Sequence, residues 1–418
     1  MQDYNRMLDS INSLTIYKNI ANDKIIKILK RVLTDEDNLN ALADLTAFLV
    51  KQAEEKGFSG NLFKNYINHL IISDENVFTL FCENNAHFSG DISLGKLAQA
   101  DIAALTELAE TDLTQLPDSR FMMDAMELLM DYTPVNPKVG LSSETLNINN
   151  IVDFHRKNGC GDISIYRVFK YRSDKKALVG VEHPDTITFD DLIGYTAQIS
   201  ELRDNTEAFL QGFPANNILL VGARGTGKSS SVKALVNAYC DQGLRLVEIT
   251  KEQIAELPDI LKLLRPRGRK FIVYIDDLSF DENEIQYKYM KSLLEGGSEG
   301  KPDNVLFYAT SNRRHIIQEK WSDRNTDSTV ADIHTADTLN EKLSLSDRFG
   351  ITITYSKPTP QEYVNIAVGL AKRNGITLSD EEIKQAALRW ELNQKGMSGR
   401  TAKQFIENLM WEEKKKRN

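Results

Sequence analysis

The stretch Gly-Ala-Arg-Gly-Thr-Gly-Lys-Ser at residues 222–229 constrains the fold of this chain more than any other feature. It matches the phosphate-binding pattern G-x-x-x-x-G-K-[ST] at every fixed position. An apolar run at 217–221 precedes it and indicates a buried strand, whereas residues 230–239 have the spacing of an amphipathic helix. In that context the N–H groups of the loop and of the helix N-terminus converge on phosphates. The alternative is a glycine-rich turn that begins an ordinary helix, and the flanking strand makes it the weaker interpretation.

Each residue type in this loop predicts a different task at a nucleotide. The glycines allow positive φ angles and a close approach of the backbone to the phosphates. The ammonium of Lys228 is expected between the phosphates, and the hydroxyl of Ser229 is expected to bind Mg²⁺. The predicted nucleotide-binding residues of the loop are Gly222, Ala223, Arg224, Gly225, Thr226, Gly227, Lys228, Ser229 and Ser230.

Length, composition and charge exclude several classes of protein. A chain of 418 residues exceeds one ordinary core, and 41% hydrophobic with 27% charged residues is typical of a soluble globular chain. The sequence has neither an apolar run of 18 residues nor a signal-peptide pattern, and its three cysteines are far apart. We therefore expect a cytoplasmic protein that has no membrane contact. The net charge of −9 argues against a surface devoted to nucleic acid.

The periodicity of apolar residues divides the chain into four parts. Residues 1–150 predict a separate, mostly α-helical N-terminal domain, which we expect to bind an unidentified protein partner. Residues 151–186 predict a short β-containing connector, with alternation typical of a strand at 163–171. Strands and helices alternate over 187–357, which predicts a mainly parallel sheet sandwiched by helices. Residues 358–418 return to helical spacing and predict a small C-terminal lid.

Two acidic residues follow one of the predicted strands. The apolar run 271–275 ends in Asp276 and Asp277, about fifty residues after the phosphate loop. The first carboxylate is placed to hold Mg²⁺ beside Ser229, and the second is placed to polarise an attacking water. Acids commonly begin loops, so the pair alone is weak evidence for a nucleotide site. It indicates such a site because it lies in the same alternating unit as the phosphate loop.

Three more polar residues stand where a nucleotide site requires them. The next strand, 305–309, leads to Asn312, which we expect to contact the γ-phosphate and the water, with Thr310 as the alternative. Arg348 precedes the last strand and is expected to reach the γ-phosphate of a neighbouring subunit; a surface ion pair is the other interpretation. Arg400, at the start of the last lid helix, is placed to fold over the nucleotide of its own chain.

In this order the segments resemble an AAA+ ATPase. More narrowly, they resemble an uncharacterised bacterial AAA+ family described only as a domain of unknown function. The resemblance covers roughly residues 186–418, and the segments that carry it are 191–195, 216–230, 276–280, 308–315 and 341–350. It implies an α/β P-loop AAA+ core with a helical lid, ATP and Mg²⁺ as cofactors, and a homo-oligomer, of which a ring is one form.

The resemblance also implies a role for each matching residue. Lys228 and Ser229 match Walker A, Asp276 matches the metal-linked acid of Walker B, Asn312 matches sensor 1, Arg348 matches the finger acting in trans, and Arg400 matches sensor 2. Ile193 and Gly194 match the segment that lines the adenine pocket.

One residue departs from the family pattern. Walker B usually ends in Asp-Glu, whereas here it ends in Asp276-Asp277, so the second carboxylate lies about one methylene further from the water. Slow turnover would follow, or Glu282 would act in place of Asp277.

Three functions agree with the sequence. The leading hypothesis is an ATPase that hydrolyses ATP at subunit interfaces to remodel or load an unidentified macromolecule. The second is a nucleic-acid-associated loader or initiator, which the acidic balance disfavours. The third is an ATP-dependent switch with very slow hydrolysis, for which the shorter acid Asp277 is the reason.

Overall fold

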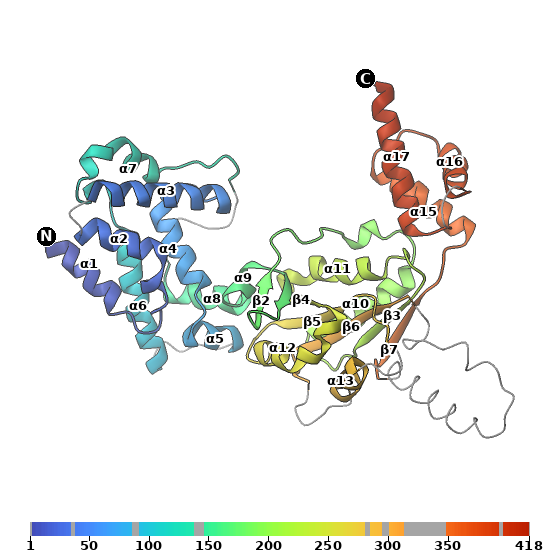
Figure 1. Ribbon diagram of the computed structural model, residues 1–418, viewed down its shortest axis with the longest axis horizontal. Coiled ribbons are helices and arrows are strands. Elements are labelled where there is room, and N and C mark those ends of the chain that lie inside the picture. The colour runs from blue at the N-terminus through green and yellow to red at the C-terminus, as the bar shows by residue number, and fades with distance from the viewer. Residues whose placement is uncertain are drawn as a thin grey trace. The chain divides into compact units, whose positions relative to one another are not determined.

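The computed structural model describes residues 2–34, 38–85, 92–137, 146–280, 285–294, 301–312, 348–392 and 396–417. The chain forms two compact units, Met1–Ile165 and Tyr166–Asn418. Figure 1 follows the chain from the blue helices of the first unit to the red helices at its C-terminus.

The first unit is helical, in agreement with its periodicity. Its helices close on a single apolar core, in which Ile25, Leu42 and Ile67 are fully buried. Polar residues begin several helices; the side chain of Asn76, for example, accepts the N–H groups of the first turn of its helix. The helices are α1 Gln2–Asn12, α2 Lys24–Thr34, α3 Asn38–Lys56, α4 Leu62–Ser73, α5 Val77–Asn84, α6 Ser93–Ala109, α7 Met123–Met130, α8 Ile148–Asn158 and α9 Asp162–Ile165.

The second unit is built on the mainly parallel sheet that the alternating pattern predicts. The strand order is β2-β1-β4-β5-β6-β3-β7, and β2 alone among these strands is antiparallel to its neighbour. The strands are β1 Val168–Arg172, β2 Ala177–Gly180, β3 Ile218–Gly222, β4 Leu244–Ile249, β5 Lys270–Ile275, β6 Val305–Ser311 and β7 Ile351–Tyr355.

Helices cover both faces of this sheet, as Figure 1 shows with α11 on one side and α12 and α13 on the other. Alternate residues of the strands, such as Ile218 and Leu246, pack with Leu202 and Leu235 in one core. Residues of the opposite parity, such as Val273, point to the other face because successive side chains of a strand alternate. The helices are α10 Thr196–Leu210, α11 Lys228–Tyr239, α12 Leu257–Leu264 and α13 Ile285–Leu294.

The structure corrects the expectation of a strand over 163–171. Residues Asp162–Ile165 form a helical turn, α9, and the strand begins only at Val168. The positive φ of Gly161 reverses the chain, and the N–H of Ser164 bonds to the carbonyl of Gly161, which closes a turn in place of a ladder. The strand β1 then pairs with β4 and extends the main sheet.

Three helices form the C-terminal lid, with a core of its own around Tyr363 and Phe405. They are α15 Pro360–Arg373, α16 Asp380–Leu392 and α17 Gly399–Arg417. Thr359 caps the first of them and Pro360 occupies its first turn, where the missing N–H costs nothing. None of the helices in the described part of the chain has the length and hydrophobicity that a membrane span requires.

Candidate nucleotide-binding site

The phosphate loop connects β3 to α11, and its glycines adopt conformations that other residues avoid. Gly222, Gly225 and Gly227 have φ angles of 147°, 76° and 94°. A Cβ at Gly222 would lie 2.0 Å from the carbonyl oxygen of Tyr355 on the neighbouring strand β7. Glycine is therefore required at this position by both backbone conformation and space.

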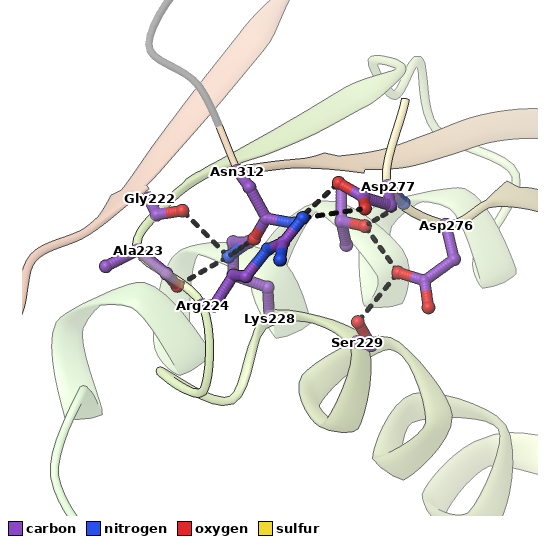
Figure 2. Close-up of polar contacts among 9 residues, drawn as sticks. Gly222, Ala223, Arg224, Lys228, Ser229, Asp276, Asp277 and Asn312 are labelled. Carbon is purple, nitrogen blue, oxygen red and sulfur yellow. Dashed lines mark hydrogen bonds and ion pairs between the residues drawn. The ribbon is translucent and has the colours of Figure 1, made fainter. Parts of the chain in front are cut away.

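Lys228 is almost completely buried at the first position of α11. Its ammonium donates to the carbonyl oxygens of Gly222 and Ala223, at 2.9 and 2.8 Å, and to Oδ1 of Asn312 at 3.1 Å (Figure 2). Burial lowers the pKa of Lys228, and the nearby carboxylates of Asp276 and Asp277 oppose that change. The loop thus holds a positive charge in its concave side, bonded to oxygen atoms of the protein.

Asp276 follows β5, and one of its oxygens accepts three hydrogen bonds. Oδ1 receives the hydroxyls of Ser229 at 2.7 Å, Thr310 at 2.6 Å and Tyr274 at 2.7 Å. Burial raises the pKa of this carboxyl, but the hydrogen bonds from Thr310, Tyr274 and Ser229 outweigh it, so the pKa lies below its ordinary value. Asp276 is consequently held as a carboxylate beside the hydroxyl of Ser229.

Asp277 adopts a left-handed backbone conformation, with φ of 51°, that is uncommon for a residue with a side chain. Its N–H donates to the hydroxyl of Thr310 at 2.9 Å, and its Oδ1 accepts the amide of Asn312 at 2.5 Å. The guanidinium of Arg224 lies 3.9 Å from its Oδ2. Figure 2 shows the three side chains converging above the phosphate loop.

A cavity of about 640 Å³ opens between the phosphate loop and the lid. One end is polar and is lined by residues 224–231 of the loop and the start of α11, by both acids and by Asn312. The other end is apolar, with Leu192, Ile193 and Tyr195 from the chain before α10, and Ile366 and Leu370 from α15. A polar end joined to an apolar end suits a ligand that has a charged tail and a flat apolar head.

The segment that precedes α10 connects the sheet to the lid. The side chain of Ile193 packs against Gly369 of α15, where a Cβ would come within 2.6 Å of it. Gly194 has φ of 86° and turns the chain into α10. Asp191 forms an ion pair of 3.1 Å with Arg373 at the end of α15. The apolar end of the cavity is therefore built jointly by the sheet subdomain and the lid.

The last lid helix contacts the phosphate loop directly. The N–H of Arg400 donates to the carbonyl oxygen of Gly225 at 3.2 Å, and the side chain of Arg400 lines the cavity. Arg348 is placed differently: it lies just before β7 and is not part of the cavity lining formed by the described residues.

The structure brings the predicted site residues together from three parts of the second unit. Arg224 to Ser230, Ile193, Asp276, Asp277, Asn312 and Arg400 line one cavity, whereas Gly222, Ala223 and Gly194 shape the backbone next to it. Glu282 lies outside the described residues. Among those that are described, no group of three or more His, Cys, Asp or Glu side chains is arranged to hold a metal ion.

The structure adds Tyr274 to the predicted residues of the site and shows what Thr310 contacts. Tyr274 stands two residues before Asp276, so the alternation of side chains along an extended chain places both on one side, and this spacing is the signal in the sequence. Thr310, considered only as an alternative to Asn312, contacts both acids, whereas Asn312 contacts Asp277 and Lys228.

A family model described as "Protein of unknown function (DUF815)" matches residues 164–413, which is more than half of the chain. Two curated relatives come from Haloferax volcanii. Proteasome-activating nucleotidase 2 is 25% identical over 203 residues, which are 42% of this chain and 49% of the relative. Proteasome-activating nucleotidase 1 is 24% identical over 182 residues, 37% of this chain and 45% of the relative. The chain thus spans about half the length of the curated relatives it matches.

Structures of RuvB from Thermotoga maritima are also similar to this chain. One mutant has 16% sequence identity and a TM-score of 0.36, and the match covers 52% of this chain and 62% of RuvB. A second structure, described as a Holliday junction branch migration motor, has 15% identity and a TM-score of 0.32, over 53% of this chain and 72% of RuvB.

Proposed function

The chain belongs to the family described as "Protein of unknown function (DUF815)", which confirms its resemblance to an AAA+ family of unknown function, and on this premise we propose that it binds ATP with Mg²⁺ and hydrolyses ATP at subunit interfaces. One observation carries the proposal. Lys228, Ser229, Asp276, Asp277 and Asn312 belong to a single hydrogen-bonded network, joined through Thr310, at the polar end of the cavity. Distant similarity to two nucleotidases supports the same class of reaction.

The polar end of the cavity would bind the phosphates. The loop N–H groups and the N-terminus of α11 favour anions, and Lys228 would exchange its bonds to carbonyl oxygens for bonds to phosphate oxygens. The hydroxyl of Ser229 and the carboxylate of Asp276 offer oxygen atoms only, which suits Mg²⁺ completed by phosphates and water. Ile193 and its apolar neighbours would hold the adenine.

Asp277 would orient and polarise the attacking water, with Asn312 holding that carboxylate in place. The same contact favours a second candidate function, a nucleotide switch with very slow turnover. A short carboxylate whose Oδ1 already accepts an amide at 2.5 Å has only its other oxygen left for the attacking water.

Arg348 would complete the site of a neighbouring subunit. It lies before β7 and outside the cavity lining of the described residues, so in this proposal its guanidinium serves another chain's γ-phosphate. Assembly and catalysis would then depend on each other. We further propose that the helical first unit binds a protein partner and that hydrolysis remodels or loads a macromolecule.

Mixing two inactive variants tests this arrangement. K228A keeps Arg348 but lacks the lysine of the loop, and R348A keeps the loop but lacks the arginine. Each variant alone is expected to lose ATP turnover by about a hundredfold or more. In an equal mixture, random assembly places an intact loop beside an intact arginine at about a quarter of the interfaces. Turnover should therefore return to about a quarter of the wild-type rate. R6A, which removes an arginine whose side chain is 74% exposed in the first unit, is the matched control.

The outcomes separate the candidates. An inactive mixture of variants that still assemble would show that Arg348 does not act in trans. Wild-type protein that binds ATP tightly and releases no phosphate would favour the switch. DNA binding that weakens steeply with added salt would favour the loader.

A further inference from the structure

A second cation of the phosphate loop faces the acid that is proposed to activate water. Arg224 is the third residue of the loop, and its side chain is 78% exposed where it lines the polar end of the cavity. Its guanidinium Nη2 lies 3.9 Å from Oδ2 of Asp277 (Figure 2). The other fixed cation of the loop, Lys228, lies on the buried side of the same cavity.

Both oxygens of Asp277 are engaged by these contacts. Oδ1 accepts the amide of Asn312 at 2.5 Å, and Oδ2 faces Arg224. The backbone of Asp277 is fixed as well, because its N–H donates to the hydroxyl of Thr310 at 2.9 Å. The side chain of Asp277 is 56% exposed, so water can reach Oδ2, but there it competes with the guanidinium of Arg224.

The ion pair between Arg224 and Asp277 is weak enough to be exchanged. Exposed ion pairs of this kind stabilise a protein little, because solvent screens them and both side chains lose freedom. A terminal phosphate carries more charge and more acceptor oxygens than one carboxylate, and guanidinium bonds to it with matching geometry. ADP lacks that terminal group, so it offers Arg224 no competing partner of this kind.

We propose that Arg224 exchanges Asp277 for the γ-phosphate when ATP binds. Without a triphosphate, Arg224 pairs with Oδ2 of Asp277 and competes with water for this oxygen. With ATP in the cavity, Arg224 contacts the γ-phosphate, and Oδ2 becomes available to the attacking water. Arg224 is then the residue by which the loop distinguishes ATP from ADP. This inference rests on the proposed function, because it requires the cavity to bind ATP.

Binding measurements on the full chain test the exchange without relying on turnover. Calorimetry with Mg²⁺ would give the Kd values of ADP and of the non-hydrolysable β,γ-imido analogue of ATP, for wild type, R224Q and R224K. R224Q should weaken binding of the ATP analogue by about fivefold to tenfold. Its Kd for ADP should stay within about twofold of wild type, because only an exposed ion pair is lost. R224K keeps the charge and should restore part of the discrimination.

R172Q is the matched control, since Arg172 is also exposed and paired with an aspartate, Asp174, but lies on β1, four strands from β3. It should change neither Kd. Equal weakening of both nucleotides by R224Q would indicate a structural role in the loop and would overturn the inference while leaving the proposed function intact. Unchanged affinity for both would overturn it as well. If wild-type protein bound neither nucleotide, the proposed function would fail, and this inference with it.

Discussion

Replacing Thr310 with valine isolates the hydrogen bonds that hold the two acids of the candidate site. The hydroxyl of Thr310 donates to Oδ1 of Asp276 at 2.6 Å and accepts the N–H of Asp277 at 2.9 Å, and the residue is 2% exposed. Valine has nearly the same shape, so T310V removes both bonds without opening a cavity. The loss of a bond to a carboxylate costs about 1.5–3 kcal/mol, and an N–H without a partner costs about 1–3 kcal/mol when it is fully buried, whereas the bond of the Asp277 N–H is only partly buried.

Two features of the site reduce that sum. Asp276 keeps the hydroxyls of Ser229 and Tyr274, and its carboxylate is only partly shielded from solvent. The added methyl group of valine is also better suited to a buried position. We therefore expect T310V to lower the free energy of unfolding of the second unit by about 2 kcal/mol.

Urea unfolding followed by tryptophan emission measures this quantity. The three tryptophans, at positions 321, 390 and 411, all belong to the second unit, so their emission reports on that unit. T352V makes the same chemical change at an exposed position of β7 and should alter stability by less than about 0.5 kcal/mol. If T310V matched T352V, the hydrogen bonds of Thr310 would not stabilise the fold, and the reasoning would be refuted.

Two more predictions concern backbone strain and pH. G222A should destabilise the second unit by about 3 kcal/mol or more, because φ is 147° and the new Cβ would lie 2.0 Å from the carbonyl oxygen of Tyr355. G212A, where φ is 82° but space is open, should cost about 1 kcal/mol in the same urea assay, and an equal loss for both variants would contradict the steric argument. In the first unit, burial lowers the pKa of His69 from 6.5 to about 4, so the stability that its neutral form contributes is complete above pH 6.5 and is lost as the pH falls towards 4. Urea unfolding followed by far-UV circular dichroism at pH 7 and at pH 4.5 measures this loss of stability. Between the two pH values, the free energy of unfolding should fall less for H69Q than for wild type. An equal fall in both proteins would contradict the role given to His69.

The core of the second unit was predictable because its physics is local. Strands of a parallel sheet covered on both faces read as continuous apolar runs, and the strand predicted at 271–275 lies within β5, Lys270–Ile275. The loop pattern at 222–229 likewise fixes a strand, a turn and a helix in sequence order. The prediction of a strand at 163–165 was wrong because alternation over three residues cannot be distinguished from a single helical turn after a glycine.

The site was predictable by residue type and less so by contact. Which strand ends carry acids and amides is visible in the sequence, but which hydroxyl reaches which carboxylate depends on strand order. The sequence does not show that β6 lies between β5 and β3, and this order is what brings Thr310 to Asp276 and Asn312 to Lys228. The pairing of Arg224 with Asp277 depends on the same arrangement.

The hydrogen bond from the N–H of Arg400 to the carbonyl of Gly225 has a thermodynamic consequence for the lid. In the proposed function, one peptide group of the phosphate loop would take part in binding phosphate, and its carbonyl is the point where the start of α17 contacts the loop. A partner that binds the lid and breaks this hydrogen bond would change the affinity for nucleotide by a certain factor. Linkage then requires nucleotide to change the affinity for that partner by the same factor. The coupling between a partner that binds the lid and the nucleotide can therefore be measured through nucleotide affinity alone.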